Sequence, residues 1–311
     1  MSAPVRLGTC SWADQGLIER WYPSTCRSAE ARLRYYAERF DTVEVNSSYY
    51  AIPEAATAQR WAERTPDGFV FHVKAFGLMT GHRVRPEQLP PDLRPLVDRL
   101  TSRGNVEPTP ELTRRVFRRF ADALAPLREA GKLGGVLMQY PPSLAAGEAS
   151  RALVEESCSR LGDVEALVEF RERSWLADDE RASTLGWLED RGLTYVAVDA
   201  PVVTTANVSE TVTARTSETA YVRFHGRNAD TWNVKSGVAS DRFDHYYEDA
   251  ELEPWSEPLR ELGRSATRVY AMFNTNNADQ GPANATLLRR ILERDGVPVT
   301  PEPGPAQGSL F

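Results

Sequence analysis

The sequence predicts an α/β protein that folds as a single TIM-type (β/α)8 barrel. Eight short runs rich in Val, Phe, Tyr and Leu follow one another along the 311 residues, and most are separated by segments with apolar residues at helical spacing. Alternating strands and helices favour a parallel sheet, and eight such units close into a barrel. No run is followed by a GxGxxG turn, which argues against the alternative of a doubly wound nucleotide-binding sheet.

The expected elements alternate in the order that such a barrel requires. The strands are expected at residues 5–12, 42–50, 69–76, 133–141, 165–172, 193–200, 220–227 and 268–275. The helices are expected at residues 29–40, 54–64, 112–130, 149–161, 180–190 and 283–292. The strand runs are rich in β-branched and aromatic residues, whereas the helical segments repeat their apolar residues every three or four positions.

Two segments depart from this alternation, and a third changes composition. Residues 77–132 form a long insertion whose first half is broken by prolines, which is typical of a loop or lid with short helices. Residues 201–219 are rich in Thr, Val and Ser and show no helical pattern. The barrel is therefore expected to cover residues 1–296, and the proline-rich residues 297–311 to form an extended, disordered tail.

The composition excludes several classes of protein. With 41% hydrophobic residues the chain can bury a substantial core. No stretch reaches the roughly 18 apolar residues of a membrane span, and the N-terminus enters a strand without a signal peptide, so we expect a cytoplasmic protein with no membrane partner. The three cysteines, Cys10, Cys26 and Cys158, lack CxxC or metal-ligand spacing, which favours a reducing compartment. A net charge of −7 gives no overall nucleic-acid-binding signature.

Polar side chains collect at the carboxyl ends of all eight expected strands, where barrel enzymes place their active sites. Glu169 and Arg171 lie two positions apart in one strand and therefore share one of its faces. Three other strands repeat this spacing, in the pairs Glu44 and Asn46, His72 and Lys74, and Arg223 and His225. The candidate catalytic residues are Glu44, Lys74, Glu169, Arg171, Asp199, Arg223 and His225. The candidate substrate-binding residues are Trp12, Asn46, Tyr50, His72, Gln139, Trp175, Asn274 and Asn276.

The carboxylates among these candidates could transfer protons or hold a divalent metal ion. Glu44, Glu169 and Asp199 would make a mixed oxygen and nitrogen site together with His225, although no HxH or HExxH spacing appears. In the alternative interpretation, the lysine and arginines among the candidates neutralise the carboxylates in a buried ion-pair network. The same cations would suit a substrate that carries phosphate or carboxylate. A divalent metal ion is the cofactor that the sequence leaves open.

Two further features allow either a binding role or a structural one. Trp12 and Trp175 follow strand ends and could stack on a base or a sugar, or could pack at the barrel rim. A basic cluster in the insertion and the following helix could contact the phosphates of a nucleic acid, or could form a solvated helix face. Its members are His82, Arg83, Arg85, Arg94, Arg99, Arg103, Arg114, Arg115, Arg118 and Arg119.

Motifs spread over almost the whole chain resemble the YecE-like family, also described as domain of unknown function 72. They are GTCSW, WYP, FDTVEVNSSYY, FHVKAF, QYPPS, VEFRERSW, YVRFHGR, and FN with a later Asn284–Ala285. The resemblance implies a TIM-type barrel with polar strand ends and no established activity. The lid departs from the family's usual Thr-His pair, because Gly81 separates Thr80 from His82. The barrel is also similar in outline to the endonuclease IV type, whose histidine-rich metal cluster this sequence lacks.

The last five residues, QGSLF, resemble the motif by which bacterial proteins bind the sliding clamp. Gln307, Leu310 and Phe311 match its glutamine and its Leu-Phe pair, whereas Gly308 replaces a frequent leucine. A flexible tail can present two apolar anchors to a preformed hydrophobic pocket, with the glutamine supplying hydrogen bonds. The sequence therefore predicts the sliding clamp as a partner.

These observations favour an enzyme that hydrolyses a phosphate-bearing substrate, with nucleic acid as a possible substrate and the tail as the route to DNA. The carboxylates and His225 would transfer protons or hold a metal ion, and the cations would stabilise charge on phosphate. One alternative is an isomerase, lyase or glycosidase acting on a small sugar. The other is a non-catalytic accessory protein for the clamp or for nucleic acid.

Overall fold

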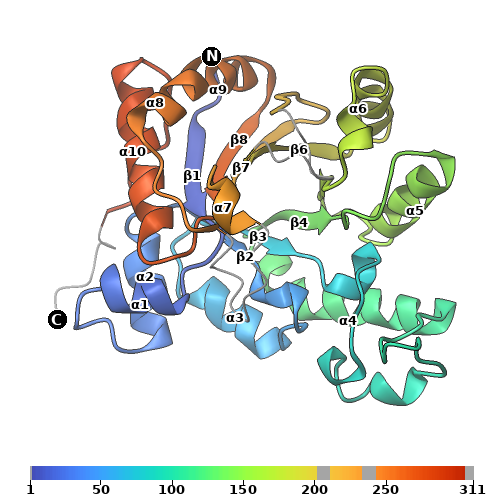
Figure 1. Ribbon diagram of the computed structural model, residues 1–311. Helices are drawn as coiled ribbons and strands as arrows, with labels where there is room; N and C mark the ends of the chain where they lie inside the picture. Colours follow the sequence, from blue (N-terminus) through green and yellow to red (C-terminus); the bar gives the residue numbers. More distant parts are fainter. Residues whose placement is uncertain (1, 202–210, 233–242, 305–311) are drawn as a thin grey trace.

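A computed structural model describes residues 2–201, 211–232 and 243–304, which form a closed barrel of eight parallel strands (Figure 1). The strands are β1 (Val5–Thr9), β2 (Thr42–Val45), β3 (Val70–Lys74), β4 (Leu133–Gln139), β5 (Ala166–Glu169), β6 (Thr194–Asp199), β7 (Thr219–Phe224) and β8 (Arg268–Phe273). Each strand pairs with the next along the chain, and β8 pairs with β1 to close the barrel. The predicted fold class is confirmed.

All eight expected strands are present, but most end earlier than the sequence pattern indicated. The second strand stops at Val45 rather than at Tyr50, and the fifth stops at Glu169 rather than at Glu172. The residues beyond these points enter loops at the carboxyl ends of the strands. Several candidate site residues, among them Asn46 and Arg171, therefore lie on loops that emerge from the barrel mouth.

Helices and short 3-10 turns surround the barrel. The α-helices are α1 (Gln15–Arg20), α2 (Ala29–Ala37), α3 (Ala55–Glu63), α4 (Pro110–Glu129), α5 (Glu148–Ser159), α6 (Arg181–Asp190), α7 (Ala229–Trp232), α8 (Asp249–Leu252), α9 (Ser256–Ser265) and α10 (Gln280–Arg294). The 3-10 helices are η1 (Ser47–Tyr49), η2 (Gly77–Thr80), η3 (Pro86–Gln88), η4 (Arg94–Leu96), η5 (Arg173–Leu176) and η7 (Glu253–Trp255). The six expected helices are confirmed, whereas α1, α7, α8 and α9 were not expected. None of the helices in the described ranges has the length and apolar character that crossing a bilayer would require.

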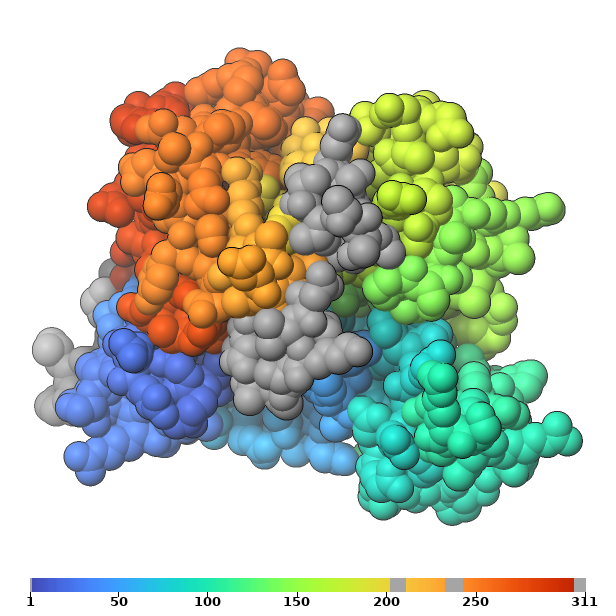
Figure 2. Space-filling model, viewed as in Figure 1, coloured from blue at the N-terminus to red at the C-terminus, as the bar shows by residue number. Residues whose placement is uncertain are grey.

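The insertion has the predicted character of a loop with short helices, and it projects from the barrel as a separate lobe at the lower right (Figure 2). Helices η2, η3 and η4 interrupt it before α4 begins. Thr109 starts α4 as its N-cap, because its hydroxyl accepts a hydrogen bond from Leu112 N at 3.1 Å. In the irregular crossover, residues 201 and 211–218 are described and contain neither helix nor strand.

The first part of the proline-rich tail is packed, which corrects the expectation of an extended, disordered segment from Val297 onward. Val297 is buried, and Val299 forms a parallel bridge with Val5 at the start of β1. The Thr300 amide donates to Val5 O at 3.0 Å, and the Gly304 amide donates to Glu38 O at 2.9 Å. These backbone hydrogen bonds hold the segment against the barrel despite its prolines. It lies at the amino-terminal end of the barrel, opposite the mouth.

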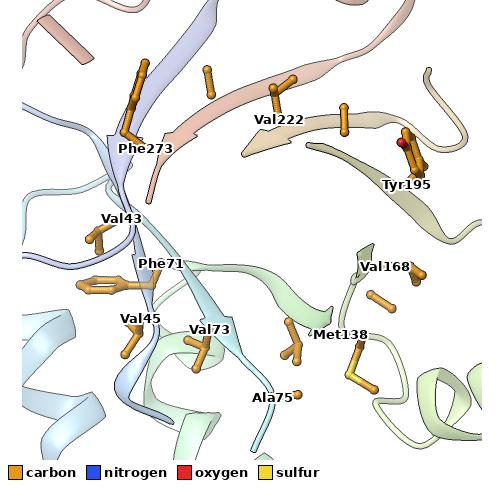
Figure 3. Close-up of a cluster of buried hydrophobic side chains, with 14 of the residues drawn as sticks. Val43, Val45, Phe71, Val73, Ala75, Met138, Val168, Tyr195, Val222 and Phe273 are labelled. Carbon is orange, nitrogen blue, oxygen red and sulfur yellow. The ribbon is translucent and has the colours of Figure 1, made fainter. Parts of the chain in front are cut away.

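Two apolar layers result from the alternation of side chains along each strand. Figure 3 shows part of the outer layer, in which Val43, Phe71, Val222 and Phe273 point from the strands toward the helices. The inner layer fills the barrel itself and includes Leu137, Leu167, Val196, Tyr221, Tyr270 and Met272. Because inner residues of different strands meet across the barrel, polar residues of the same parity also meet there.

Two glycine-to-alanine substitutions test how tightly this interior is packed. A Cβ at Gly134 in β4 would contact Val70 Cγ1 and would lie 2.6 Å from His72 Cε1, so Gly134→Ala should lower the free energy of unfolding by about 1–3 kcal/mol. A Cβ at Gly186 in α6 would have no heavy atom within 4 Å, so Gly186→Ala should raise it by about 0.5–1 kcal/mol. Urea unfolding of both variants checks this, and equal effects of the two would contradict the described packing.

Candidate active site

One buried guanidinium joins two buried carboxylates across the barrel. Arg223, near the end of β7, donates from Nε to Glu44 Oε2 at 3.0 Å and from Nη2 to Glu44 Oε1 at 2.6 Å. Its Nη1 donates to Glu169 Oε2. The three side chains are at most 1% exposed, and β2, β5 and β7 are not neighbours in the sheet. The predicted shared interior of these residues is therefore what the structure shows.

Glu169 is the carboxylate of the site with the most polar contacts. Besides Arg223, its carboxylate accepts from Gln139 Nε2 at 2.6 Å and from Arg171 Nη1 at 3.1 Å. The His225 Nε2 lies 3.3 Å from Glu169 Oε1. Burial favours a raised pKa for this carboxyl, but Arg223, His225 and Arg171 outweigh it and hold the pKa of Glu169 well below its usual range. Glu169 is therefore a carboxylate with all its hydrogen-bonding capacity engaged.

His225 is neutral and fixed in orientation. Burial, followed by the charge of Arg223, lowers the pKa of His225 to about 3. Asn274 Nδ2 lies 2.9 Å from His225 Nδ1, and an amide nitrogen at this position donates. Its Nε2 lies 3.2 Å from Arg223 Nη1 and 3.3 Å from Arg171 Nη1, besides facing Glu169. Asn46 Nδ2 in turn donates to Asn274 Oδ1 at 3.0 Å, which extends the network to the carboxyl ends of β8 and β2.

The outer edge of this network carries two cations. Lys74 Nζ donates to Gln139 Oε1 at 2.8 Å and lies 4.6 Å above the Tyr49 ring. Burial, followed by repulsion from Arg223, lowers the pKa of Lys74 to about 8. Arg171, whose side chain is 17% exposed, lies 5.1 Å above the Trp232 ring. Both side chains are thus less buried than the Arg223 guanidinium beneath them.

The charges of this cluster do not cancel. It holds the cations of Lys74, Arg171 and Arg223 against the two carboxylates of Glu44 and Glu169, with His225 neutral. Among the described residues, no carboxylate lies within 4.0 Å of the Lys74 ammonium. The excess positive charge belongs to the partly exposed side of the network, where an anionic ligand could reach it.

Asp199 does not join this network, which corrects its assignment to the catalytic set. Val196 and Val198 of β6 point into the barrel, so Asp199 points outward. Its carboxylate pairs with Arg227, with Nη2 at 2.8 Å, and accepts from Tyr247 OH at 2.5 Å. The bond to Tyr247 ties β6 to the segment before α8.

Four candidate substrate-binding residues lie outside the network. Trp175 is fully buried, stacks on Phe170 with centroids 4.2 Å apart and donates to Leu144 O. Trp12 packs edge-on against Trp61 at 5.6 Å, so both tryptophans have the packing role that the sequence left open. His72 is buried between Tyr221 and Tyr270, at 4.8 and 4.4 Å. Tyr50 is 53% exposed beside Tyr49, at the surface rather than in the network.

The structure brings several residues here whose place at these strand ends was not predicted. Tyr221 OH donates to Glu44 Oε2 at 3.0 Å, and its spacing of two from Arg223 was a usable signal. His82 comes from the insertion, packs edge-on against Tyr49 at 5.1 Å and lies 2.8 Å from Thr80 Oγ1 through Nδ1. Burial, followed by Lys74 and Arg171, lowers the pKa of His82 to about 4. Nothing in the chain pattern placed His82 or Trp232 beside these strand ends.

The four residues considered for a metal ion do not form one site. Asp199 lies on the outer face of its strand, whereas Glu44 and Glu169 are held by arginines. Within the described ranges, no three His, Cys, Asp or Glu residues are grouped as a metal site would require. These four residues therefore do not fit a shared ion.

A hollow of about 1050 Å³ lies at the other end of the barrel, around the first residues of β4 to β8. Its wall contains the ion pairs Arg268–Glu165 at 3.0 Å and Arg215–Glu189 at 3.7 Å. In barrels of this type that end contributes to stability, whereas chemistry takes place at the carboxyl ends of the strands. The network around Arg223 is therefore the better candidate for an active site.

Lys74 should destabilise the folded protein at neutral pH. Its pKa falls from 10.5 to about 8 on folding, so the folded state binds the proton more weakly than the unfolded state does. Lys74→Met should then raise the free energy of unfolding by roughly 1–3 kcal/mol below pH 8. This gain should shrink as pH rises from 8 and vanish near pH 10.5. Urea unfolding of both proteins between pH 7 and 10.5 measures it, and a variant less stable than wild type at pH 7 would refute the assignment.

Comparison with known proteins identifies relatives of nearly the same length. The chain is 28% identical over 292 residues to the UPF0759 protein YunF of Bacillus subtilis (strain 168), covering 93% of this chain and 95% of the relative. It is 27% identical over 303 residues to the UPF0759 protein YecE of Escherichia coli (strain K12), covering 95% of this chain and 98% of the relative.

Solved structures show the same barrel. A DUF72 family protein of Thermotoga maritima MSB8 is similar with a TM-score of 0.73 at 26% identity, covering 93% of this chain and 99% of that chain. Another from Enterococcus faecalis V583 has a TM-score of 0.75 at 22% identity, covering 93% and 95%. The family model described as "Protein of unknown function DUF72" matches residues 6–307, and the chain therefore belongs to the DUF72 family.

Proposed function

We propose that this protein is an enzyme whose barrel mouth binds a phosphate-bearing substrate through Lys74 and Arg171. The observation that carries the proposal is the Lys74 ammonium at the partly exposed edge of the network, which has no carboxylate within 4.0 Å among the described residues and shares that edge with Arg171. A guanidinium and an ammonium at the edge of one network suit the oxygens of a phosphate group. Because the surroundings are largely buried, such contacts are stronger than on an open surface.

The two buried glutamates support this site rather than transfer protons. Glu44 accepts hydrogen bonds from Nε and Nη2 of Arg223 and from the Tyr221 hydroxyl. Glu169 is contacted by four polar side chains, those of Gln139, Arg171, Arg223 and His225. A carboxylate so fully engaged, with its pKa held low in the case of Glu169, is a poor proton acceptor. Their role in the proposal is to fix the positions of Arg223, Gln139 and Arg171.

Hydrolysis of a phosphate ester is the reaction that we propose for this site. Lys74 and Arg171 would stabilise the negative charge on the phosphate oxygens while water attacks phosphorus. His82 supplies a neutral imidazole near these cations. A bound phosphate would oppose the charges of Lys74 and Arg171 and raise the pKa of His82 toward the range of a general base.

Binding of inorganic phosphate tests the proposal directly. We expect calorimetric titration to show binding to the wild type, and Lys74→Met and Arg171→Met each to weaken it roughly 10- to 100-fold, since each removes a charge-assisted hydrogen bond. Arg264→Gln is the matched control, because Arg264 is 63% exposed in the last turn of α9 and should have no effect.

The comparison between these variants also distinguishes binding at the mouth from attraction of phosphate to any positive charge on the protein. Equal losses in Arg264→Gln and Lys74→Met would indicate attraction to the whole protein rather than to the mouth. Absence of phosphate binding to the wild type would overturn the proposed site.

Recruitment to DNA through the C-terminus is a separate part of the proposal. Gln307, Leu310 and Phe311 lie outside the described residues, so their role as a clamp-binding motif stays a prediction. The preceding segment reaches Gly304 at the end of the barrel opposite the mouth. A clamp bound beyond that point would therefore leave the mouth accessible to substrate.

Binding to the sliding clamp of the source organism checks this part. The full-length protein should bind, and both truncation after Ala306 and the double change Leu310→Ala and Phe311→Ala should abolish binding, because the two apolar anchors are lost. Ser309→Ala is the control and should bind as the wild type does. Equal binding by the full-length and truncated proteins would remove the clamp from the proposal.

A further inference from the structure

We infer that the substrate of the proposed phosphate site is a phosphorylated sugar, whose hydroxyl groups are bound by Asp14, Asn46 and Asn276. The inference rests on the proposed function, because it assigns the second half of the same mouth. The three residues follow three neighbouring strands of the closed barrel, β1, β2 and β8. The cations occupy the next strands around the ring, with Lys74 at the end of β3 and Arg171 just after β5.

Each of the three residues has a buried oxygen with no hydrogen-bond partner among the described residues. The atoms are Asp14 Oδ2, Asn46 Oδ1 and Asn276 Oδ1. Buried polar atoms without partners are rare, and a group of them is a sign of a ligand or ordered water. All three are acceptors, so the complementary ligand presents donors. Several hydroxyl groups on one small molecule satisfy that requirement.

These acceptors are close to one another in the fold. Burial raises the pKa of Asp14 and the side chains of Ser11 and Asn276 lower it, so these three side chains lie close together. Asn46 bonds Asn274, which lies two residues before Asn276 on the same strand end. The acceptors therefore follow the rim from α1 toward the His225 network.

The loop that carries Asn276 is held in one conformation. Ala278 has a positive φ of 49°, which is uncommon for a residue other than glycine. Gly16 of α1 packs directly on it, since a Cβ at Gly16 would lie 2.6 Å from Ala278 N. The close approach requires glycine there and fixes the loop against α1. An acceptor on a fixed loop is preorganised for its ligand.

The phosphate and hydroxyl halves meet at Asn46 and Lys74. Val45 of β2 pairs with Val73 of β3, so Lys74 at the end of β3 and Asn46, the first residue after β2, follow paired residues of adjacent strands. Adjacent strands lie about 4.8 Å apart, a separation that a small sugar phosphate can span. A second phosphate is a poor match for the acceptor half, because Asp14 and the amide oxygens would repel it.

Calorimetric titration with phosphate and phosphorylated sugars tests the inference. The ligands are inorganic phosphate, ribose 5-phosphate, glucose 6-phosphate and fructose 6-phosphate. We expect at least one sugar phosphate to bind the wild type tenfold or more tightly than inorganic phosphate. Asn276→Ala should weaken that binding about fivefold, and Asp14→Ala about tenfold or more, because the lost acceptor is neutral in one and charged in the other. Neither change should alter binding of inorganic phosphate.

Asn277→Ala is the matched control, since Asn277 neighbours Asn276 but contributes no orphaned buried oxygen. It should bind every ligand as the wild type does. Phosphate binding without tighter binding of any sugar phosphate would overturn the inference and leave the phosphate site standing. A sugar preference that survives both Asn276→Ala and Asp14→Ala would overturn the assignment of these acceptors. Failure of all ligands to bind would overturn the phosphate site and the inference with it.

Discussion

The bidentate pairing of Arg223 with Glu44, completed by its bond to Glu169, is the interaction on which the rest of the mouth depends. It connects three strands that do not touch in the sheet, and all three groups are removed from water. Breaking a buried pair of this kind typically costs about 3–5 kcal/mol, because the remaining charge keeps no partner. Loss of the Arg223 guanidinium would leave two carboxylates facing each other across the barrel. Gln139, Arg171 and Tyr221 are all positioned by bonds to these carboxylates.

In this arrangement the charges that hold the site together lie deep in the barrel, and the charges that a ligand could reach lie nearer its surface. Both carboxylates are paired and hydrogen-bonded inside the barrel, whereas two of the three cations lie at its less buried edge. Below them, Tyr221 links the polar network to the interior, since its ring packs on His72 while its hydroxyl bonds Glu44. His72 has no hydrogen-bond partner in the described residues, and burial lowers its pKa to about 3, so it is part of an apolar layer despite its type. The barrel thus changes from an apolar layer, through a layer of paired charges, to a cationic edge at the mouth.

Spacing in the sequence predicted the interior of the site because a strand has a strict period of two. The pairs that include Glu44, Glu169 and Arg223 each share one face of a strand, and the structure has this face on the inside of the barrel. The same reasoning was wrong for Asp199, because β6 is buried on both sides and its apolar alternation gives no sign of which face is inner. Trp175 and Trp12 were ambiguous for a related reason, since residues beyond a strand end no longer follow its period. The position of His82 could not be predicted from the sequence, because it depends on how the insertion folds back onto Tyr49.

The lowered pKa of Lys74 connects the stability of this barrel to its proposed use. A protonated lysine that is mostly buried, with an amide oxygen as its one side-chain acceptor among the described residues, is costly to maintain. Nothing in the packing requires a charge at this position, since an apolar side chain of similar length would fill the space above Tyr49. A bound phosphate would supply the missing negative charge and return the pKa of Lys74 toward its ordinary value. Lys74 destabilises the ligand-free protein, and an anionic ligand would remove this cost on binding, whereas a neutral ligand would not. The site would therefore bind an anion more tightly than a neutral ligand of the same shape.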